Sequence, residues 1–236
     1  MHIQGSVLQD ICVSILSQHD VPAGDAELVA NTLVEANLRG YDSHGVIRLP
    51  LWVEGLTRGT IKARPNIKIK TQKAASALVD GDYGLGPVVG EYVTKLAMDR
   101  AQEFGISAVS VQHASHLSML SYYAEKAARK KLIAIIMTNT EPAMAPHGGR
   151  EKILGTNPIC IAVPAEPNPH ILDISSSIVA RGKLLVAKSK KESIPEAWAL
   201  DKSGKPTTNP ADALDGALRS ASTRQPSAFT RHSHAS

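Results

Sequence analysis

The sequence predicts an α/β protein that consists of an N-terminal helical layer and a mixed-sheet domain of non-Rossmann topology. Two observations support this class. Residues 6–59 carry apolar side chains at helical spacing. Beyond Pro65, short apolar runs typical of strands alternate with helical stretches, a pattern that builds helices on a partly parallel sheet. With 236 residues, 43% of them hydrophobic, the chain can form a substantial core.

The helical layer is expected to contain three helices. Ser6 opens a capping-box pattern, Pro22 suits the first turn of a helix, and Gly40 and Gly59 are typical of helix ends. The expected spans run from Ser6 to near His19, from Pro22 to Gly40 and from about Ile47 to Gly59.

The second part is expected to hold six strands and two helices. The strands are predicted at 67–71, 77–79, 106–111 (buried), 132–137, 159–163 and 171–174, and the helices at 88–104 and 119–128. The expected domains are a helical segment at 1–65, an α/β cofactor-binding domain at 66–215 and a disordered tail at 216–236, whose sequence lacks apolar periodicity.

Composition narrows the class of protein. The net charge of +4 comes from scattered basic residues and aromatics make up 4% of the chain, so no nucleic-acid platform is expected. Cys12 and Cys160 lie far apart in apolar settings, which predicts neither a disulfide framework nor a zinc site. Without a leader or a membrane-length apolar run, a cytoplasmic protein without a membrane partner is expected.

The stretch 40–50 concentrates the groups that suit acid–base chemistry on a small acid. Ser43, His44, Gly45 and Arg48 lie between two predicted helices. A histidine exchanges protons near neutral pH, and an arginine binds a carboxylate with two parallel hydrogen bonds. The alternative is a polar helix–turn–helix connection in which Gly45 is a cap and Arg48 a solvated charge.

Two other motifs are weaker. Gly84 to Gly90 follows a strand and opens a helix, but its spacing and its proline do not fit a dinucleotide-binding turn, so a structural strand-to-helix turn is favoured. His113 and His116 have metal-like spacing, but no third ligand is near, and no metal is expected. Proton chemistry or cofactor contact is the better interpretation of His116.

Polar residues also follow two predicted strands. Thr140 and Thr156 flank a loop rich in glycine and proline, which is explained equally well by ligand binding or by turn geometry. Asp173 precedes Ile174, Ser175 and Ser176 at the other strand end. It could accept hydrogen bonds from ribose hydroxyls or simply cap the helix that follows.

Five motifs in order resemble the malate/L-lactate dehydrogenase family of the non-Rossmann type, which includes ureidoglycolate, sulfolactate and cyclic-imine-acid oxidoreductases. They cover the chain to about Leu214 and read D-S-H-G-V-I-R at 42–48, H-A-S-H at 113–116, M-T-N-T-E-P-A-M-A-P-H-G-G-R at 137–150, L-G-T-N-P-I at 154–159 and I-P-E-A-W-A-L-D-K-S-G-K-P-T-T-N-P at 194–210.

The resemblance implies hydride transfer between NAD or NADP and a small 2-hydroxy or 2-oxo acid, in a homodimer when the chain is complete. The implied catalytic residues are His44 or His116 for the proton, with Ser43 orienting the histidine. Arg48 and Thr156 are implied for the substrate. The implied cofactor-binding residues are His116, Thr140, Asp173, Ile174, Ser175 and Ser176. Lys183 stands where one branch of the family has a carboxylate, so its charge relay is not expected here.

The sequence from about Arg219 departs from the family, whose chains continue further. A chain truncated at its C-terminus is therefore expected, and the alternative to an active enzyme is a catalytically inactive remnant. Loss of the remaining family structure is expected to leave apolar faces of the helical layer partly uncovered, namely Val29, Leu33, Val53 and Leu56.

Overall fold

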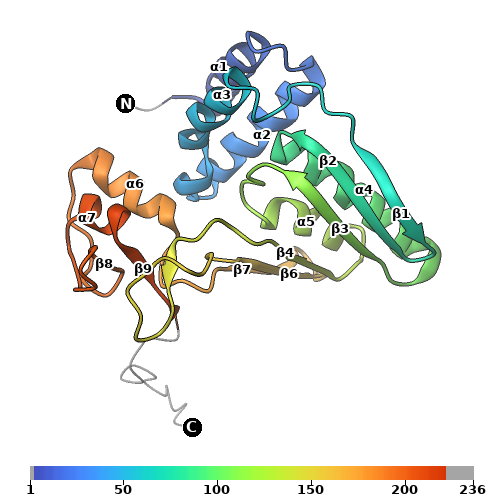
Figure 1. Ribbon diagram of the computed structural model, residues 1–236. Coiled ribbons are helices and arrows are strands. Elements are labelled where there is room, and N and C mark those ends of the chain that lie inside the picture. Colours follow the sequence, from blue (N-terminus) through green and yellow to red (C-terminus); the bar gives the residue numbers. More distant parts are fainter. Residues whose placement is uncertain (1–2, 222–236) are drawn as a thin grey trace. The chain divides into compact units, whose positions relative to one another are not determined.

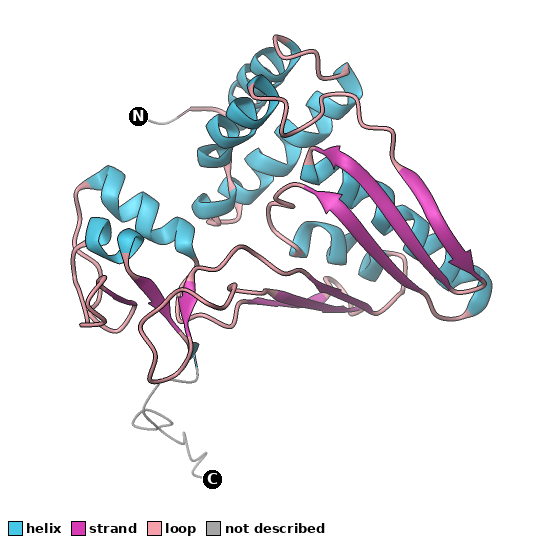
Figure 2. Cartoon of the chain, viewed as in Figure 1, coloured by secondary structure: helices cyan, strands magenta, loops and turns pink. Residues whose placement is uncertain are grey.

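A computed structural model describes residues 3–221 (Figures 1 and 2). The chain divides into two compact units. The first comprises the residues up to Met137 together with Ile159–Ile174, and the second comprises Thr138–Pro158 and the residues from Ser175 onward. These units differ from the ranges 1–65, 66–215 and 216–236, which stay a prediction about domains.

The first unit begins with the helical layer. Its helices are α1 (Gly5–Ser17), α2 (Ala23–Leu38) and α3 (Leu49–Thr57). The predicted capping box is wrong: α1 begins at Gly5, its N-cap is Gln4 and no side chain caps it, so Ser6 lies inside the first turn. Gly40 and Gly59 follow α2 and α3 with φ of +78° and +70°, the left-handed backbone that favours glycine.

The faces of α2 expected to be uncovered are buried. Val29 and Leu33 are both 0% exposed, because they pack in a cluster to which α1 contributes Leu16 and α3 contributes Trp52. The expectation of partial exposure is wrong for these two residues. Val53 and Leu56 are half-buried against the same cluster. The helical layer therefore has a buried core, to which Leu85 before α4 also contributes.

A three-stranded mixed sheet follows, with α4 (Gly86–Phe104) packed against it (Figure 1). Its strands are β1 (Lys68–Lys73), β2 (Ser76–Gly84) and β3 (Ala108–Ala114), in the order β1-β2-β3. β1 and β2 pair antiparallel, and β2 and β3 pair parallel. The prediction of a buried strand at 106–111 is wrong: β3 is an edge strand without a buried residue, and Ile106 before it is 72% exposed.

A second, antiparallel sheet completes the first unit. Its strands β4 (Ala134–Met137), β6 (Ile159–Val163) and β7 (His170–Ile174) pair in the order β4-β6-β7. α5 (Ser121–Arg129) packs on the face that buries Cys160 and Ala162. Besides His170, the side chains that these strands expose are apolar, namely Ile135, Met137, Val163, Leu172 and Ile174.

The second unit contains two helices and a small sheet. The helices are α6 (Arg181–Lys190) and α7 (Pro210–Asp215). The strands are β5 (Met144–Ala145), β8 (Ala199–Leu200) and β9 (Ala217–Arg219), in the order β5-β9-β8. Strand β9 falls in the range expected to be a tail. The rest of that range, 222–236, lies outside the described residues.

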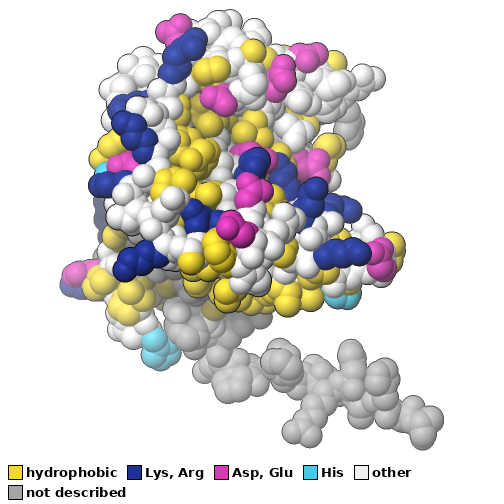
Figure 3. All heavy atoms as spheres, turned by 90° about the vertical axis from the view of Figure 1, so that its right-hand side faces the viewer, with side chains coloured by type: hydrophobic (Ala, Val, Ile, Leu, Met, Phe, Trp, Pro, Cys, Tyr) yellow, Lys and Arg dark blue, Asp and Glu magenta, His cyan; other side chains and the backbone are white. Residues whose placement is uncertain are grey.

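The predicted α/β class, with a helical layer and mixed sheets, is confirmed. The described residues form three separate three-stranded sheets. On the surface shown in Figure 3, basic and acidic side chains are interspersed. Ion pairs of the first unit include Lys62–Asp82 and Lys95–Asp99. None of the helices in the described part of the chain is long and apolar enough to span a membrane.

Candidate functional site

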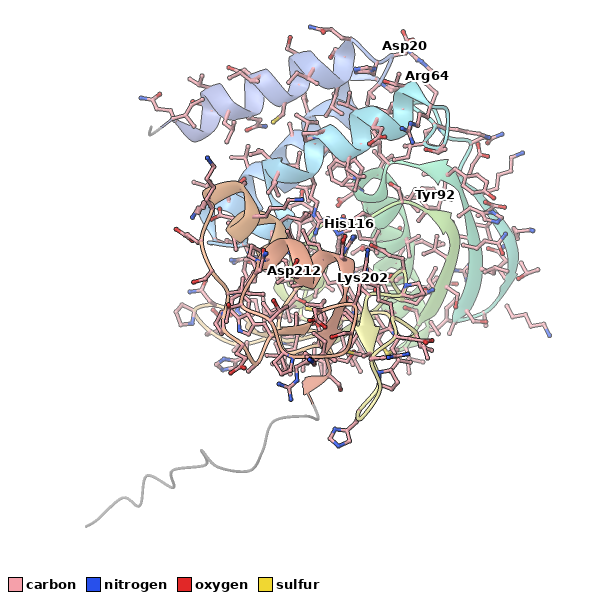
Figure 4. The ribbon with its side chains drawn as sticks, turned by 60° about the vertical axis from the view of Figure 1, so that its left-hand side comes forward. Asp20, Arg64, Tyr92, His116, Lys202 and Asp212 are labelled. Atoms are coloured by element: carbon pink, nitrogen blue, oxygen red, sulfur yellow. The ribbon has the colours of Figure 1, made fainter. Side chains whose placement is uncertain are left out.

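The first unit brings two of the predicted histidines together. His44 ends the 3-10 turn Asp42–His44, and His116 lies in the loop after β3 (Figure 4). Their ring centroids are 5.6 Å apart. Ser43 and Arg48 come from the same pair of 3-10 turns, Asp42–His44 and Val46–Arg48. Residues separated by 72 positions thus form one polar cluster.

Asn37, at the end of α2, holds the turn that carries His44. Its amide oxygen accepts a hydrogen bond of 2.9 Å from the Val46 N–H, and its amide nitrogen donates to Asp42 Oδ1 at 2.7 Å. A Cβ at Gly45 would lie 2.1 Å from the same amide oxygen, so a side chain there would push the Asn37 amide out of these hydrogen bonds. Sequence reasoning identified Gly45 but missed Asn37, which precedes it by eight residues at no familiar motif spacing.

Ser43 connects the histidine with the arginine. Its Oγ lies 2.9 Å from His44 Nδ1, and its carbonyl oxygen accepts a hydrogen bond of 2.7 Å from Arg48 Nε. Ser43 is itself buried. The first contact places the Ser43 hydroxyl against the imidazole, although its orienting role stays a prediction, and the second holds the Arg48 guanidinium through Nε.

Both histidines are held neutral. Burial lowers the pKa of His44 to about 4, with a further contribution from the positive charge of Arg48, while the negative charge of Asp173 opposes the shift. Burial, Arg48 and His44 together lower the pKa of His116 to about 3. At neutral pH the cluster therefore offers two uncharged imidazoles beside one guanidinium.

The loop that carries His116 sits close to the start of α4. A Cβ at Gly86 would lie 1.9 Å from the His116 carbonyl oxygen, and the Gly86 N–H donates to Ser115 Oγ at 2.7 Å. This close approach gives Gly86 a packing role, in agreement with the structural interpretation of the 84–90 motif. The Trp52 ring lies 6.5 Å from the His116 ring.

His113 does not join this cluster. Its Nδ1 lies 3.0 Å from Asp80 Oδ1, and its ring stacks on Tyr83 with centroids 4.6 Å apart. The backbone N–H of Asp82, which donates to Asp80 Oδ1, and the side chain of His113 lower the pKa of Asp80 to about 2. Within residues 3–221, no three His, Cys, Asp or Glu side chains are grouped as metal ligands would be.

Asp173 caps a helix, although not the one that follows it. Its Oδ2 accepts a hydrogen bond of 2.9 Å from the Ser121 N–H at the start of α5. The Ser121 hydroxyl is buried, with no hydrogen-bond partner in the described part of the chain. Ile174, the next residue, is exposed on β7. A carboxylate and an unsatisfied hydroxyl thus lie at the N-terminus of α5.

The remaining predicted residues lie together in the second unit. Thr140 Oγ1 accepts a hydrogen bond of 2.9 Å from the Thr156 N–H, and the two threonine hydroxyls are 3.3 Å apart. Ser176 donates to the Thr156 carbonyl oxygen from both its N–H and its hydroxyl. Ser175 Oγ lies 3.1 Å from Ser177 Oγ.

Asn157 is a site residue of this second group that sequence reasoning missed. Its Oδ1 accepts from the Thr140 N–H at 3.1 Å, and a Cβ at Gly155 would lie 2.4 Å from the same atom. The G-T-N-P sequence was a possible signal, because it places an amide beside the threonine.

A comparison with protein families decides the relationship. Residues 3–226 match the model of malate/L-lactate dehydrogenases. The chain belongs to this family. It is 45% identical over 208 residues to an L-sulfolactate dehydrogenase of Methanocaldococcus jannaschii, and 34% identical over 211 residues to an NAD⁺ ureidoglycolate dehydrogenase of Escherichia coli O157:H7.

Solved structures of this family have the same fold. A dehydrogenase from Sinorhizobium meliloti matches with a TM-score of 0.90 and 38% identity, over 94% of this chain and 65% of its own. The sulfolactate dehydrogenase from M. jannaschii matches with a TM-score of 0.83 and 43% identity, over 93% of this chain and 64% of its own. The two sequence relatives above are matched over 88% and 89% of this chain. The chain spans 60% of the length of each.

Proposed function

We propose that this chain is the substrate- and cofactor-binding part of an oxidoreductase that transfers a hydride between a nicotinamide cofactor and a small 2-hydroxy or 2-oxo acid. One observation carries the proposal: two buried, neutral imidazoles lie 5.6 Å apart beside the charge of Arg48. A carboxylate and an adjacent oxygen that gains or loses a proton are the two features that such a cluster recognises.

Arg48 is proposed to bind the substrate carboxylate. Its Nε donates to the Ser43 carbonyl, and this contact holds the guanidinium close to both histidines. Its positive charge there contributes to the lowered pKa of each. His44 or His116 exchanges the proton with the substrate oxygen, and Ser43 orients His44 through Nδ1. Thr156 is proposed to contact the substrate, the role that the family resemblance gives it.

The cofactor is proposed to be NAD or NADP, because the relatives include an NAD⁺ ureidoglycolate dehydrogenase and an NADP⁺ (2R)-3-sulfolactate dehydrogenase. When bound, it would supply the acceptor or donor of the hydride. The carboxylate of Asp173 and the hydroxyls of Ser175 and Ser176 are polar groups that suit the ribose hydroxyls and phosphate oxygens of such a cofactor. His116, Thr140, Asp173, Ile174, Ser175 and Ser176 are proposed to hold it.

The assembly and the compartment are also proposals. A homodimer is supported by the exposed apolar side chains of β4, β6 and β7, since faces of this kind are typical of association surfaces. A cytoplasmic location is supported by two buried cysteines that form no disulfide. No nucleic-acid or membrane partner is proposed.

The test is a cofactor titration followed by a turnover assay. NAD⁺ and NADP⁺ binding is measured by calorimetry on the 236-residue chain and on a chimera that adds the remaining C-terminal part of the M. jannaschii relative. Malate, lactate, sulfolactate and ureidoglycolate are then assayed at the nicotinamide absorbance, in both directions. We expect turnover of at least one acid by the chimera and its loss in His44→Gln.

The control is His170→Gln, which removes an exposed histidine from β7 in the same unit. It should retain the activity of the parent protein. Cofactor binding without turnover in both proteins would support the inactive remnant. A folded chimera that neither binds the cofactors nor turns over any acid would contradict the proposed function.

A further inference from the structure

Ser118 contacts both histidines of the cluster. Its backbone N–H donates a hydrogen bond of 3.0 Å to His116 Nδ1, and its hydroxyl donates one of 2.8 Å to the His44 carbonyl oxygen. The side chain is buried. One residue therefore bridges the loop after β3 and the turn after α2, two segments that are otherwise distant in the chain.

The backbone at Ser118 has an unusual conformation. Its φ is +63°, in the left-handed region that residues other than glycine seldom adopt. Such a conformation persists where surrounding contacts hold it and is often found at functional sites. Here the hydroxyl bond to His44 is such a contact, and the left-handed turn directs the N–H of the same residue toward the His116 ring.

The bond to His116 determines where that imidazole carries its proton. A backbone N–H can only donate, so His116 Nδ1 must present its lone pair. The single proton of the neutral ring is then on Nε2. His116 consequently offers a hydrogen-bond donor, and not an acceptor, at Nε2.

His44 is not restricted in this way. The partner of its Nδ1 is the Ser43 hydroxyl at 2.9 Å, and a hydroxyl can donate or accept. When Nδ1 carries the proton and donates to Ser43 Oγ, Nε2 presents a lone pair. The partner of Nδ1 thus restricts Nε2 of His116 to donating, whereas it allows Nε2 of His44 to accept.

We propose that Ser118 is a positioning residue that locks His116 as a hydrogen-bond donor and leaves His44 as the proton acceptor. This assignment rests on the proposed function. In the oxidative direction the hydroxyl proton of the substrate passes to His44 Nε2, and the hydride passes from the adjacent carbon to the nicotinamide. The N–H at His116 Nε2 donates to the substrate oxygen throughout and does not transfer its proton, so the proton and the electron pair are both accounted for.

The direct test is the tautomer of His116, measured by long-range ¹H–¹⁵N spectra of the whole protein at neutral pH. We expect the wild-type protein to carry the His116 proton on Nε2. In Ser118→Ala the tie to the His44 carbonyl is lost, the N–H at position 118 is no longer held in place, and both tautomers should be populated. This measurement does not depend on enzyme activity.

The kinetic test uses the same variants in the 236-residue chain or in the chimera, whichever turns over substrate. Ser118→Ala should lower kcat roughly tenfold while the substrate KM stays within about twofold, since misplacement of a catalytic group mainly affects the transition state. Ser118→Gly should behave alike and fold without strain, because glycine accepts the positive φ. Ser118→Gly therefore replaces Ser118→Ala in both measurements if the alanine variant fails to fold.

The matched control is Ser107→Ala. The Ser107 hydroxyl also donates to a backbone carbonyl, that of Ala97 at 2.7 Å, but it touches neither histidine. It should leave the tautomer and kcat unchanged. A wild-type His116 protonated on Nδ1, or Ser118→Gly with unaltered tautomer and kcat, would overturn the inference. A protein without turnover that still shows the expected tautomers would refute the proposed function alone.

Discussion

Asp173 is the last residue but one of strand β7, and its Oδ2 accepts a hydrogen bond of 2.9 Å from the backbone N–H of Ser121, the first residue of α5. A carboxylate is favourable at a helix N-terminus because it satisfies an unpaired N–H and opposes the helix dipole. The negative charge of Asp173 also acts to raise the pKa values of His44 and Cys160. One side chain thus combines a structural contact with an electrostatic effect on the candidate site.

Two substitutions separate the structural role of Asp173 from its proposed role in cofactor binding. Asp173→Asn keeps an oxygen that can accept from Ser121 but removes the charge, whereas Asp173→Ala removes both. We expect Asp173→Ala to lower the free energy of unfolding by about 1 kcal/mol, and Asp173→Asn to lower it less. Urea denaturation measures this difference.

Cofactor titration completes the comparison of the two Asp173 variants. If Asp173 accepts hydrogen bonds from ribose, Asp173→Asn should weaken cofactor binding even though the helix cap is retained. Cofactor affinity that follows stability alone across the two variants would show that the carboxylate serves only the helix.

The buried histidines predict a loss of stability in acid. The pKa of His44 is lowered from 6.5 to about 4, so the unfolded chain takes up this proton first as the pH falls. The contribution is complete above about pH 6.5 and is lost between about 6.5 and 4. By pH 5 His44 alone should cost about 2 kcal/mol of unfolding free energy relative to pH 8. His116, with a pKa of about 3, extends the loss to lower pH.

Urea denaturation at pH 8 and pH 5 tests this contribution. His44→Gln should lose less stability than the wild-type protein between the two values, whereas the exposed-site control His170→Gln should lose as much as the wild-type protein. An unchanged pH dependence in His44→Gln would mean that the folded protein does not hold this imidazole neutral.

Arg48→Lys keeps the positive charge but loses the planar fork that binds a carboxylate with two hydrogen bonds. We expect the substrate KM to rise roughly tenfold or more, as for a lost hydrogen bond to a charged group, while cofactor affinity changes little. The control is Arg58→Lys, at an exposed residue paired with Glu54 after α3. Equal weakening of substrate and cofactor binding would assign Arg48 a structural role through its bond to Ser43.

The sequence predicted those parts of the fold that local patterns determine. Pro22 and Gly40 set the limits of α2 because their backbone preferences are local. The exposure of Ile106 was not predictable, because the local sequence pattern before an edge strand does not differ from that before a central strand. Which strands pair, and which remain at an edge, depends on contacts between distant residues.

The same limit applies to the candidate site. The motif around His44 was recognised from adjacent residues. Asn37, Ser118 and Ser121 were not, because they act through hydrogen bonds to Val46, His44 and Asp173, residues that no motif connects with them. His113 and His116 illustrate the converse. They are close in sequence, yet the strand end directs one toward Asp80 and the other toward His44.

The exposed sheet face offers a final prediction. Ile135 and Leu172 both pair in register with Ile161 of the middle strand, so all three lie side by side on one face. The register rows of this face contain no Lys, Arg, Asp or Glu, and their polar side chain is His170, which pairs with Val163 at one end, so the face is complementary to a second copy of itself. Burying apolar surface stabilises association by roughly 25 cal/mol per Å².

We expect the chain to self-associate on sizing with light scattering, and the double variant Ile135→Lys, Leu172→Lys to shift toward monomer. Ile106→Lys, which places a charge at a similarly exposed site outside this sheet, should associate like the wild-type chain. A wild-type chain that remains monomeric at every concentration, or a double variant that associates equally, would show that this face does not bind a second copy.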